Sequence, residues 1–172
     1  MALPPAIFDD LHRVPPQGLA ARVVQRHSER GRRAAICLDG WSPQTPAAAR
    51  AFIRQAAAAW RLPRPQTQDL VQIVSELATN AVEHTHSQTI TVTAAVIPGA
   101  AVVSVTDRGP HKPLAVPAAD DRAEHGRGLH IVDTLSQTWG HLHTGTGTRV
   151  WARVALPLGA VPCRQPATGG TA

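Results

Sequence analysis

Residues 66–107 change from a helical to a strand pattern, and this change constrains the fold more than any other feature. The apolar residues in 66–84 recur at i, i+3, i+4 and i+7, which predicts an amphipathic helix. Residues 89–97 then alternate threonine with isoleucine, valine and alanine, which predicts a half-buried strand. Pro98-Gly99 predicts a turn, and 101–107 predicts the second strand of a hairpin.

The flanking segments add further helices and another hairpin. Thr45 can cap a helix and Pro46 suits a first helical turn, so we predict a helix that ends at Leu62, before two prolines. The other predicted elements are strands at 33–39, 138–143 and 148–156 and a helix at 129–137. The predicted fold is therefore α+β: a two-layer sandwich in which a mixed, mostly antiparallel sheet is covered on one face by three helices.

The charge is concentrated near the amino terminus. The chain has 172 residues and a formal net charge of +5, and residues 12–33 carry six arginines against Glu29 alone. We interpret 1–32 as a basic, largely flexible leader with at most one short helix near 18–29. Residues 33–156 form the predicted domain, and 157–172, rich in proline, glycine and threonine, form a predicted flexible tail. The proline-bearing segment 108–125 is predicted to be a long loop of the kind that acts as a lid.

Composition excludes several classes of protein. The chain is 43% hydrophobic and 17% charged, which suits a globular core rather than a disordered regulator. There is no apolar run of membrane-spanning length, and the first residues lack the pattern of a secretory signal. The two cysteines, Cys37 and Cys163, form no disulfide framework, which is typical of a cytoplasmic protein.

Three polar residues share one face of the predicted helix 66–84. Glu76, Asn80 and His84 are each four residues apart, so their side chains stack. A carboxamide oxygen can bind Mg²⁺ while phosphates supply the charge, and a carboxylate one turn earlier can deprotonate a hydroxyl or water. An ordinary solvated helix face would have the same spacing.

Two further motifs follow along the chain. Asp107 ends a predicted strand, where its carboxylate can accept a hydrogen bond from an exocyclic amine such as that of adenine. Gly109 would let a flat ring approach the backbone, although Asp-x-Gly is also an ordinary turn. Gly126-Arg127-Gly128 precedes the helix that begins at Leu129, and uncovered N–H groups at a helix start favour phosphate. A glycine-rich hinge is the alternative there. Thr148 enters the last strand after a tight turn, which hairpin chemistry alone would explain.

The order of these motifs resembles the ATP-binding domain shared by histidine kinases, type II topoisomerases and the ninety-kilodalton chaperones. The stretches E-L-A-T-N-A-V-E-H-T, V-T-D-R-G-P and H-G-R-G-L-H-I-V-D are most similar to the stand-alone anti-sigma-factor serine/threonine kinases. The resemblance covers about residues 33–156 and implies a Bergerat-type ATP-binding fold with ATP and Mg²⁺ as cofactors.

The resemblance also implies a role for each motif residue. Asn80 would hold Mg²⁺, and Glu76 would be the base that activates the acceptor. Asp107 would bind the adenine amine with Gly109 beside the ring and Thr148 near it through a water. The phosphates would be wrapped by Gly126, Arg127, Gly128 and Leu129, and His84 would support the pocket.

The resemblance implies a protein kinase that phosphorylates a small antagonist protein and sequesters a sigma factor, in some members as a homodimer. The predicted helix 46–62 would contribute to partner contact through Arg50 and Arg54. The sequence departs from the family pattern after Asp107, because only the first glycine of a Gly-x-Gly pair is present. The alternative function is therefore an ATP-sensing switch that binds a partner without phosphorylating it.

Two other readings depend on single features. Nucleic-acid binding would require the basic leader, but no aromatic residues interleave with its arginines. A metal site at His84-x-His86 or His141-x-His143 would place two ligands on one side of a strand or turn, without cysteine or aspartate partners at ligand spacing.

Overall fold

The computed structural model describes residues 23–28, 31–109, 127–144 and 147–160. Within these ranges the chain forms six strands and three helices. In chain order they are β1 (Val23–Ser28), β2 (Gly31–Asp39), α1 (Thr45–Trp60), α2 (Arg64–His84), β3 (Thr89–Ile97), β4 (Ala100–Thr106), α3 (Arg127–Leu135), β5 (Thr138–Thr144) and β6 (Gly147–Ala155).

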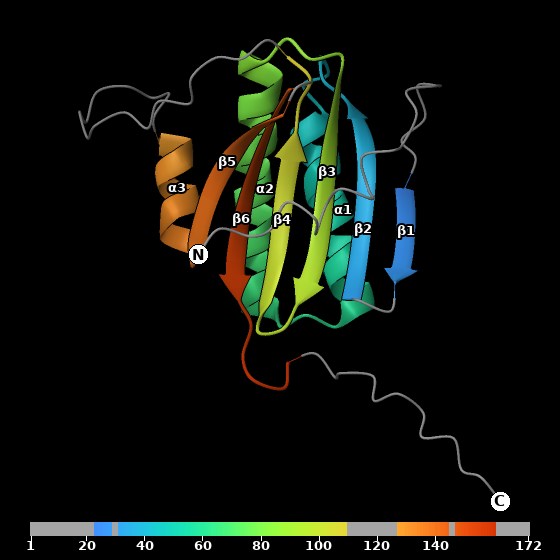
Figure 1. The fold of residues 1–172 in the computed structure, drawn as a ribbon, viewed down its shortest axis with the longest axis vertical. Coiled ribbons are helices and arrows are strands. Elements are labelled where there is room, and N and C mark those ends of the chain that lie inside the picture. Colours follow the sequence, from blue (N-terminus) through green and yellow to red (C-terminus); the bar gives the residue numbers. More distant parts are fainter. Residues whose placement is uncertain (1–22, 29–30, 110–126, 145–146, 161–172) are drawn as a thin grey trace, which may run out of the picture.

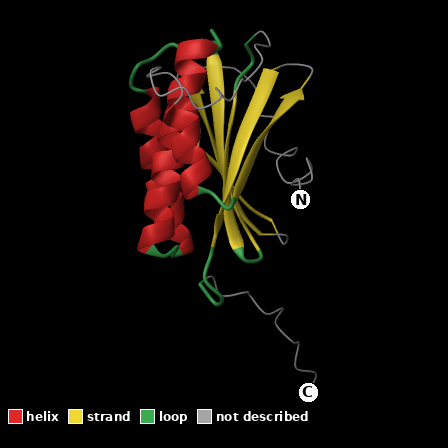
Figure 2. Ribbon diagram, turned by 90° about the vertical axis from the view of Figure 1, so that its left-hand side faces the viewer, coloured by secondary structure: helices red, strands yellow, loops and turns green. Residues whose placement is uncertain are grey.

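The strands form one sheet in the order β1-β2-β3-β4-β6-β5 (Figure 1). All five pairings are antiparallel, including the one between β4 and β6, which are not consecutive in the sequence. The three helices lie on one side of this sheet (Figure 2). The predicted two-layer α+β sandwich is confirmed, and every described pairing in the sheet is antiparallel.

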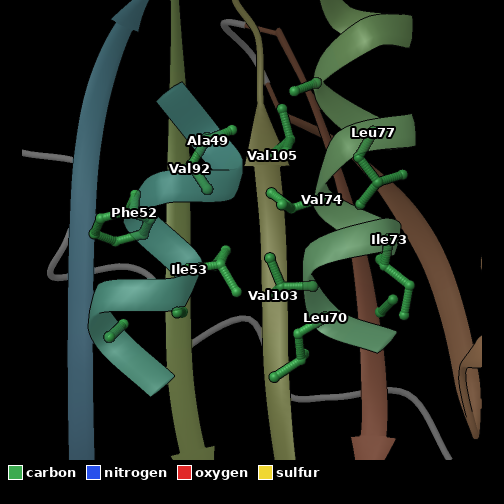
Figure 3. Packing of buried hydrophobic residues seen from close by; sticks show 14 of the residues in the cluster. Ala49, Phe52, Ile53, Leu70, Ile73, Val74, Leu77, Val92, Val103 and Val105 are labelled. Carbon is green, nitrogen blue, oxygen red and sulfur yellow. The ribbon is translucent and has the colours of Figure 1, made fainter. Parts of the chain in front are cut away.

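The core lies between α1, α2 and the sheet. Leu70, Ile73, Val74 and Leu77 of α2 are buried, as the periodicity of 66–84 predicts. They pack with Phe52 and Ile53 of α1 and with alternate valines of β3 and β4, of which Figure 3 shows Val92, Val103 and Val105. Burial of each such side chain contributes about 1.5–3 kcal/mol. This packing holds α2 firmly against the sheet.

The start of α1 differs from the sequence prediction. The residue before the helix is Gln44, which makes no side-chain capping bond, and Pro46 lies in the first turn as predicted. Thr45 is not the N-cap, because its hydroxyl donates instead to the carbonyl oxygen of Asp39 at the end of β2. The hydroxyl therefore ties α1 to the sheet rather than closing its own helix.

The prediction of a helix near 18–29 is wrong, because Val23–Ser28 forms the edge strand β1. It pairs with β2 from Val23↔Ile36 to Ser28↔Gly31. The arginine spacing suggested a helical face, but the unpaired edge of β2 offers backbone hydrogen bonds that a helix could not satisfy. Part of the predicted flexible leader thus belongs to the sheet. Residues 1–22, most of the predicted lid and 161–172 of the tail lie outside the described residues.

No helix in the described ranges is long and apolar enough to cross a membrane.

Candidate functional site

Four separate stretches of sequence meet at one end of the molecule. Figure 1 shows the end of α2, the end of β4, the start of α3 and the start of β6 at the upper edge of the sheet. These are the segments that carry the predicted motifs. Two groups of contacts join them, one around Gly128 and one around Asp107.

The first group joins α2 to the start of α3. Glu76 and Asn80 are half-buried on α2, beside its apolar stripe. A Cβ placed on Gly128 would lie 3.0 Å from Glu76 Oε2, 3.7 Å from Asn80 Nδ2 and 3.8 Å from Asn80 Oδ1. The backbone of α3 therefore approaches both polar side chains closely. Glycine at position 128 allows this approach because it has no side chain.

Gln72, a residue outside the predicted motifs, orients Glu76. Gln72 Nε2 donates to Glu76 Oε1 at 2.8 Å, while Oε2 of the same carboxylate faces Gly128. Gln72 lies four residues before Glu76, so the helical spacing that grouped Glu76 with Asn80 could also have included it.

The second group surrounds Asp107, whose side chain is only 6% exposed. Its Oδ1 accepts a hydrogen bond from the backbone N–H of Gly109 at 3.0 Å. A Cβ on Gly109 would lie 1.9 Å from the carbonyl oxygen of Thr85, just after α2. Gly109 is thus required for backbone packing against Thr85, a reason that the sequence did not reveal.

The start of β6 closes the other side of Asp107. The backbone N–H of Asp107 donates to the carbonyl oxygen of Thr148 at 3.0 Å. A Cβ on Gly147 would lie 1.8 Å from the carbonyl oxygen of Asp107, so the backbone segments at Gly147 and Asp107 are in direct contact. Thr148 is buried, and its hydroxyl lies 3.2 Å from His143 Nδ1. The structure therefore brings Asp107, Gly109 and Thr148 together.

Ser87 fastens the loop after β4 to the chain that follows α2. Its hydroxyl donates to the carbonyl oxygen of Thr89 at 2.6 Å and accepts from the backbone N–H of Arg108 at 2.9 Å. The same region packs on the loop after β2, since a Cβ on Gly40 would lie 1.9 Å from the carbonyl oxygen of Ser87. These backbone contacts hold the Asp107 carboxylate at a defined place.

The end of α2 connects the two groups. Asn80 contacts the start of α3, and Thr85, five residues later, contacts Gly109. Five helical residues span about 7.5 Å along the axis. The two groups of contacts are therefore both connected to the end of α2.

The remaining predicted residues are placed less completely. His84 is exposed on the last turn of α2, whereas Glu76 and Asn80 are half-buried. Leu129 is half-buried and packs against the core. Arg127 is the first residue of α3, but its side chain lies outside what the structure describes, as does all of Gly126.

The residues present fit a nucleotide with Mg²⁺. An amide oxygen next to a carboxylate forms an oxygen donor set, which Mg²⁺ prefers. The N–H groups at the start of α3 suit phosphate, and the absent side chain of Gly128 leaves room beside Glu76. The buried carboxylate of Asp107 can accept a hydrogen bond from an amine.

The alternative histidine metal sites gain no support from the described residues, where no group of three or more histidine, cysteine, aspartate or glutamate residues could hold a metal. His86 instead lies against Trp41, with ring centroids 6.0 Å apart. The rings of His141 and His143 lie edge to face, with ring centroids 5.2 Å apart.

Comparisons with known proteins identify the family of this fold. Residues 42–154 match the family described as histidine kinase-like ATPase domain. The solved structure of the RsbU and RsbW domains of Rv1364c from Mycobacterium tuberculosis is 26% identical, with a TM-score of 0.57, and the match covers 72% of this chain. The chain spans only 32% of that protein's length.

A histidine kinase domain from the Erythrobacter litoralis EL346 blue-light activated histidine kinase also matches. It is 21% identical with a TM-score of 0.46, and the match covers 63% of this chain and 61% of that one. A comparison with curated proteins finds no match. Because the family match spans most of the chain and includes Glu76, Asn80, Asp107 and Gly128, this protein belongs to the histidine kinase-like ATPase family, whose domain binds ATP.

Proposed function

We propose that this chain is a Mg-ATP-dependent protein kinase of the anti-sigma-factor type. It would phosphorylate a serine or threonine of a small antagonist protein and sequester a sigma factor. The observation that carries the proposal is the approach of Gly128 to Glu76 Oε2 and Asn80 Oδ1, because it joins a base candidate, a metal-ligand candidate and a phosphate-binding helix start.

Each side chain has a role that its surroundings support. Asn80 would hold Mg²⁺ together with the ATP phosphates, and the metal would neutralise phosphate charge during transfer. Asp107 would accept a hydrogen bond from the adenine amine. Thr148, joined to Asp107 through the backbone, would lie near the ring.

Glu76 is the proposed base. Gln72 donates to its Oε1, which leaves Oε2 on the side of Gly128. From there the carboxylate can take the proton of an acceptor hydroxyl. General-base catalysis of this kind contributes about 10²–10⁴-fold to a rate.

The structural likeness to the RsbW-containing protein supports the anti-sigma-factor type over a complete histidine kinase. A partner surface on α1 was expected to use Arg50 and Arg54. Arg50 is half-buried and donates to Ser75 Oγ of α2 at 2.8 Å, whereas Arg54 is exposed. Arg54 is therefore the better candidate for partner contact, and Arg50 supports the packing of α1 on α2.

The test is phosphate transfer to proteins that co-purify with the full chain, followed by mass spectrometry of every captured protein. The wild type is expected to transfer phosphate from labelled Mg-ATP to a serine or threonine. Glu76→Gln is expected to keep ATP affinity and lose about 100-fold or more in transfer rate. Glu83→Gln is the matched control, since Glu83 is an exposed acid on the same helix.

A wild-type transfer rate in Glu76→Gln would remove the base assignment. If ATP stays intact with every captured partner while still binding tightly, the kinase proposal fails and a non-catalytic ATP-sensing switch replaces it.

A further inference from the structure

The orientation of α3 matters to the proposed site, because this helix brings Gly128 to Glu76 and Asn80. The helix is only nine residues long. Val132 is wholly buried, and Leu129 and Leu135 are half-buried against the core. Apolar contacts of this kind are not directional. They hold α3 on the core without fixing the rotation of the helix about its own axis.

A directional contact joins α3 to the neighbouring strand β5 (Figure 1). Trp139 Nε1 donates to Asp133 Oδ1 at 2.8 Å. The acceptor is a carboxylate, so the bond is stronger than one between two neutral groups. Asp133 is the last residue of the stretch H-G-R-G-L-H-I-V-D, and neither it nor Trp139 has a role in the nucleotide site described above.

The sheet fixes the position of the donor. Trp139 pairs with Ala152, a core residue, so its ring lies on the side of the sheet that the helices cover. The ring is half-buried and packs against the core. On the opposite face, a Cβ on Gly140 would lie 3.0 Å from Cζ2 of Trp151. An indole ring therefore lies against the backbone of β5 directly beside Trp139.

Helical geometry relates Asp133 to Gly128. Each residue is rotated by about 100° from the one before it, so Val132 lies about 40° around the axis from Gly128. On the same measure Leu129 lies at about 100° and Asp133 at about 140°. The buried stripe thus lies between Gly128, which faces α2, and Asp133, which faces β5. A rotation that releases Asp133 from β5 would also move Gly128 relative to α2.

We propose that Asp133 and Trp139 are positioning residues of the nucleotide site. Their hydrogen bond sets the rotation of α3 and thereby the approach of Gly128 to Glu76. Neither side chain needs to touch the nucleotide. The inference rests on the proposed function, since that assigns the start of α3 to phosphate, but it requires ATP binding only and not phosphate transfer.

The test removes each side of the bond in the full chain and measures Mg-ATP affinity by calorimetry. Trp139→Phe removes the donor and keeps an aromatic ring, and Asp133→Ala removes the acceptor at an exposed position. Each variant is expected to bind Mg-ATP about fivefold more weakly. The double variant should be no weaker than either single one, because both changes remove the same bond.

Two further variants separate positioning from general damage. Asp133→Asn keeps an oxygen acceptor and should restore most of the affinity that Asp133→Ala loses. Trp151→Phe is the matched control, since it removes an indole N–H on the other face of the sheet, and it should leave the affinity unchanged.

A second readout needs no nucleotide. Glu76→Gln should shift the amide NMR signal of Gly128, because Glu76 Oε2 faces that residue. If the hydrogen bond positions α3, the same substitution should cause a smaller shift when Asp133→Ala is also present. It should cause the full shift when Asp133→Asn is present.

Wild-type affinity in both Trp139→Phe and Asp133→Ala, even with lowered stability, would overturn the proposal, because the bond would then stabilise the fold alone. Losses that add in the double variant would also overturn it. If the wild type binds no Mg-ATP, the proposed function fails and the Gly128 signal decides: a full shift with Asp133→Ala overturns positioning, and a reduced shift supports it. ATP binding without phosphate transfer counts against the kinase proposal only.

Discussion

The two halves of the proposed nucleotide site are built differently. Around Asp107, backbone lies directly on backbone: added Cβ atoms on Gly109 and Gly147 would lie 1.9 Å and 1.8 Å from carbonyl oxygens. Around Gly128, the nearest atom to an added Cβ is the end of a side chain, Glu76 Oε2, at 3.0 Å. The first half is rigid because backbone cannot move aside, and the second can adjust by side-chain rotation.

This difference predicts that variants in one half mainly lower stability and that variants in the other half mainly lower ligand affinity. The Asp107 half is part of the folded framework, so damage there should first appear as lost stability. The Gly128 half is lined by polar side chains, so changes there should affect ligands more than folding. The following variants test this contrast, from the largest expected effect to the smallest.

Gly109→Ala is expected to lower the free energy of unfolding by about 3 kcal/mol or more, because the methyl group would overlap the Thr85 carbonyl. Urea unfolding measures the loss. Gly99→Ala is the control: nothing lies within 4 Å of its added Cβ, and only its φ of +72° opposes alanine. It should cost about 1–2 kcal/mol. Equal losses would show that the Thr85 contact is not tight.

Asp107→Asn is expected to weaken ATP binding about 10- to 100-fold and to leave GTP binding unchanged, since hydrogen bonds to a charged group contribute about 1.5–3 kcal/mol. Calorimetry with both nucleotides measures this. Asp39→Asn is a matched control, because Asp39 Oδ1 also accepts a backbone N–H two residues later, at 2.8 Å, but is exposed. Unchanged ATP affinity in Asp107→Asn would refute the adenine assignment.

Asn80→Ala is expected to remove the part of ATP affinity that depends on Mg²⁺, about tenfold, or 1.4 kcal/mol. Titrations with and without Mg²⁺ should give the same affinity in this variant. Gln68→Ala, an exposed amide on the same helix, should retain the difference. A Mg²⁺ effect of wild-type size in Asn80→Ala would contradict the metal assignment.

Gly128→Ala is expected to have the smallest effect. Alanine favours the helix by about 1 kcal/mol, and Glu76 can rotate away from the new methyl group, so stability should hold or rise. ATP affinity should fall by about fivefold, equivalent to about 1 kcal/mol. Thermal unfolding and titration on one sample give both values. A large loss of stability would mean that the two halves are equally rigid.

Much of the fold could be predicted because its patterns are local. The bounds of β3 are those that the threonine alternation predicts, and α2 begins two residues earlier than the predicted helix. The strand β1 was missed, because its formation depends on pairing with β2 and not on a pattern within its own short sequence. Thr45 was assigned as a cap for the same reason: the competing carbonyl of Asp39 belongs to another element.

The sequence by itself determined which residues share a face of α2 and that 89–97 becomes a strand, since both depend on periodicity along a few turns or pleats. Only the tertiary structure decided that Glu76 and Asn80 lie against α3 while His84 is exposed. It also decided that Gly109 must be glycine because of Thr85. Contacts between residues distant in sequence depend on how helices pack on the sheet, and no short stretch of sequence contains that information.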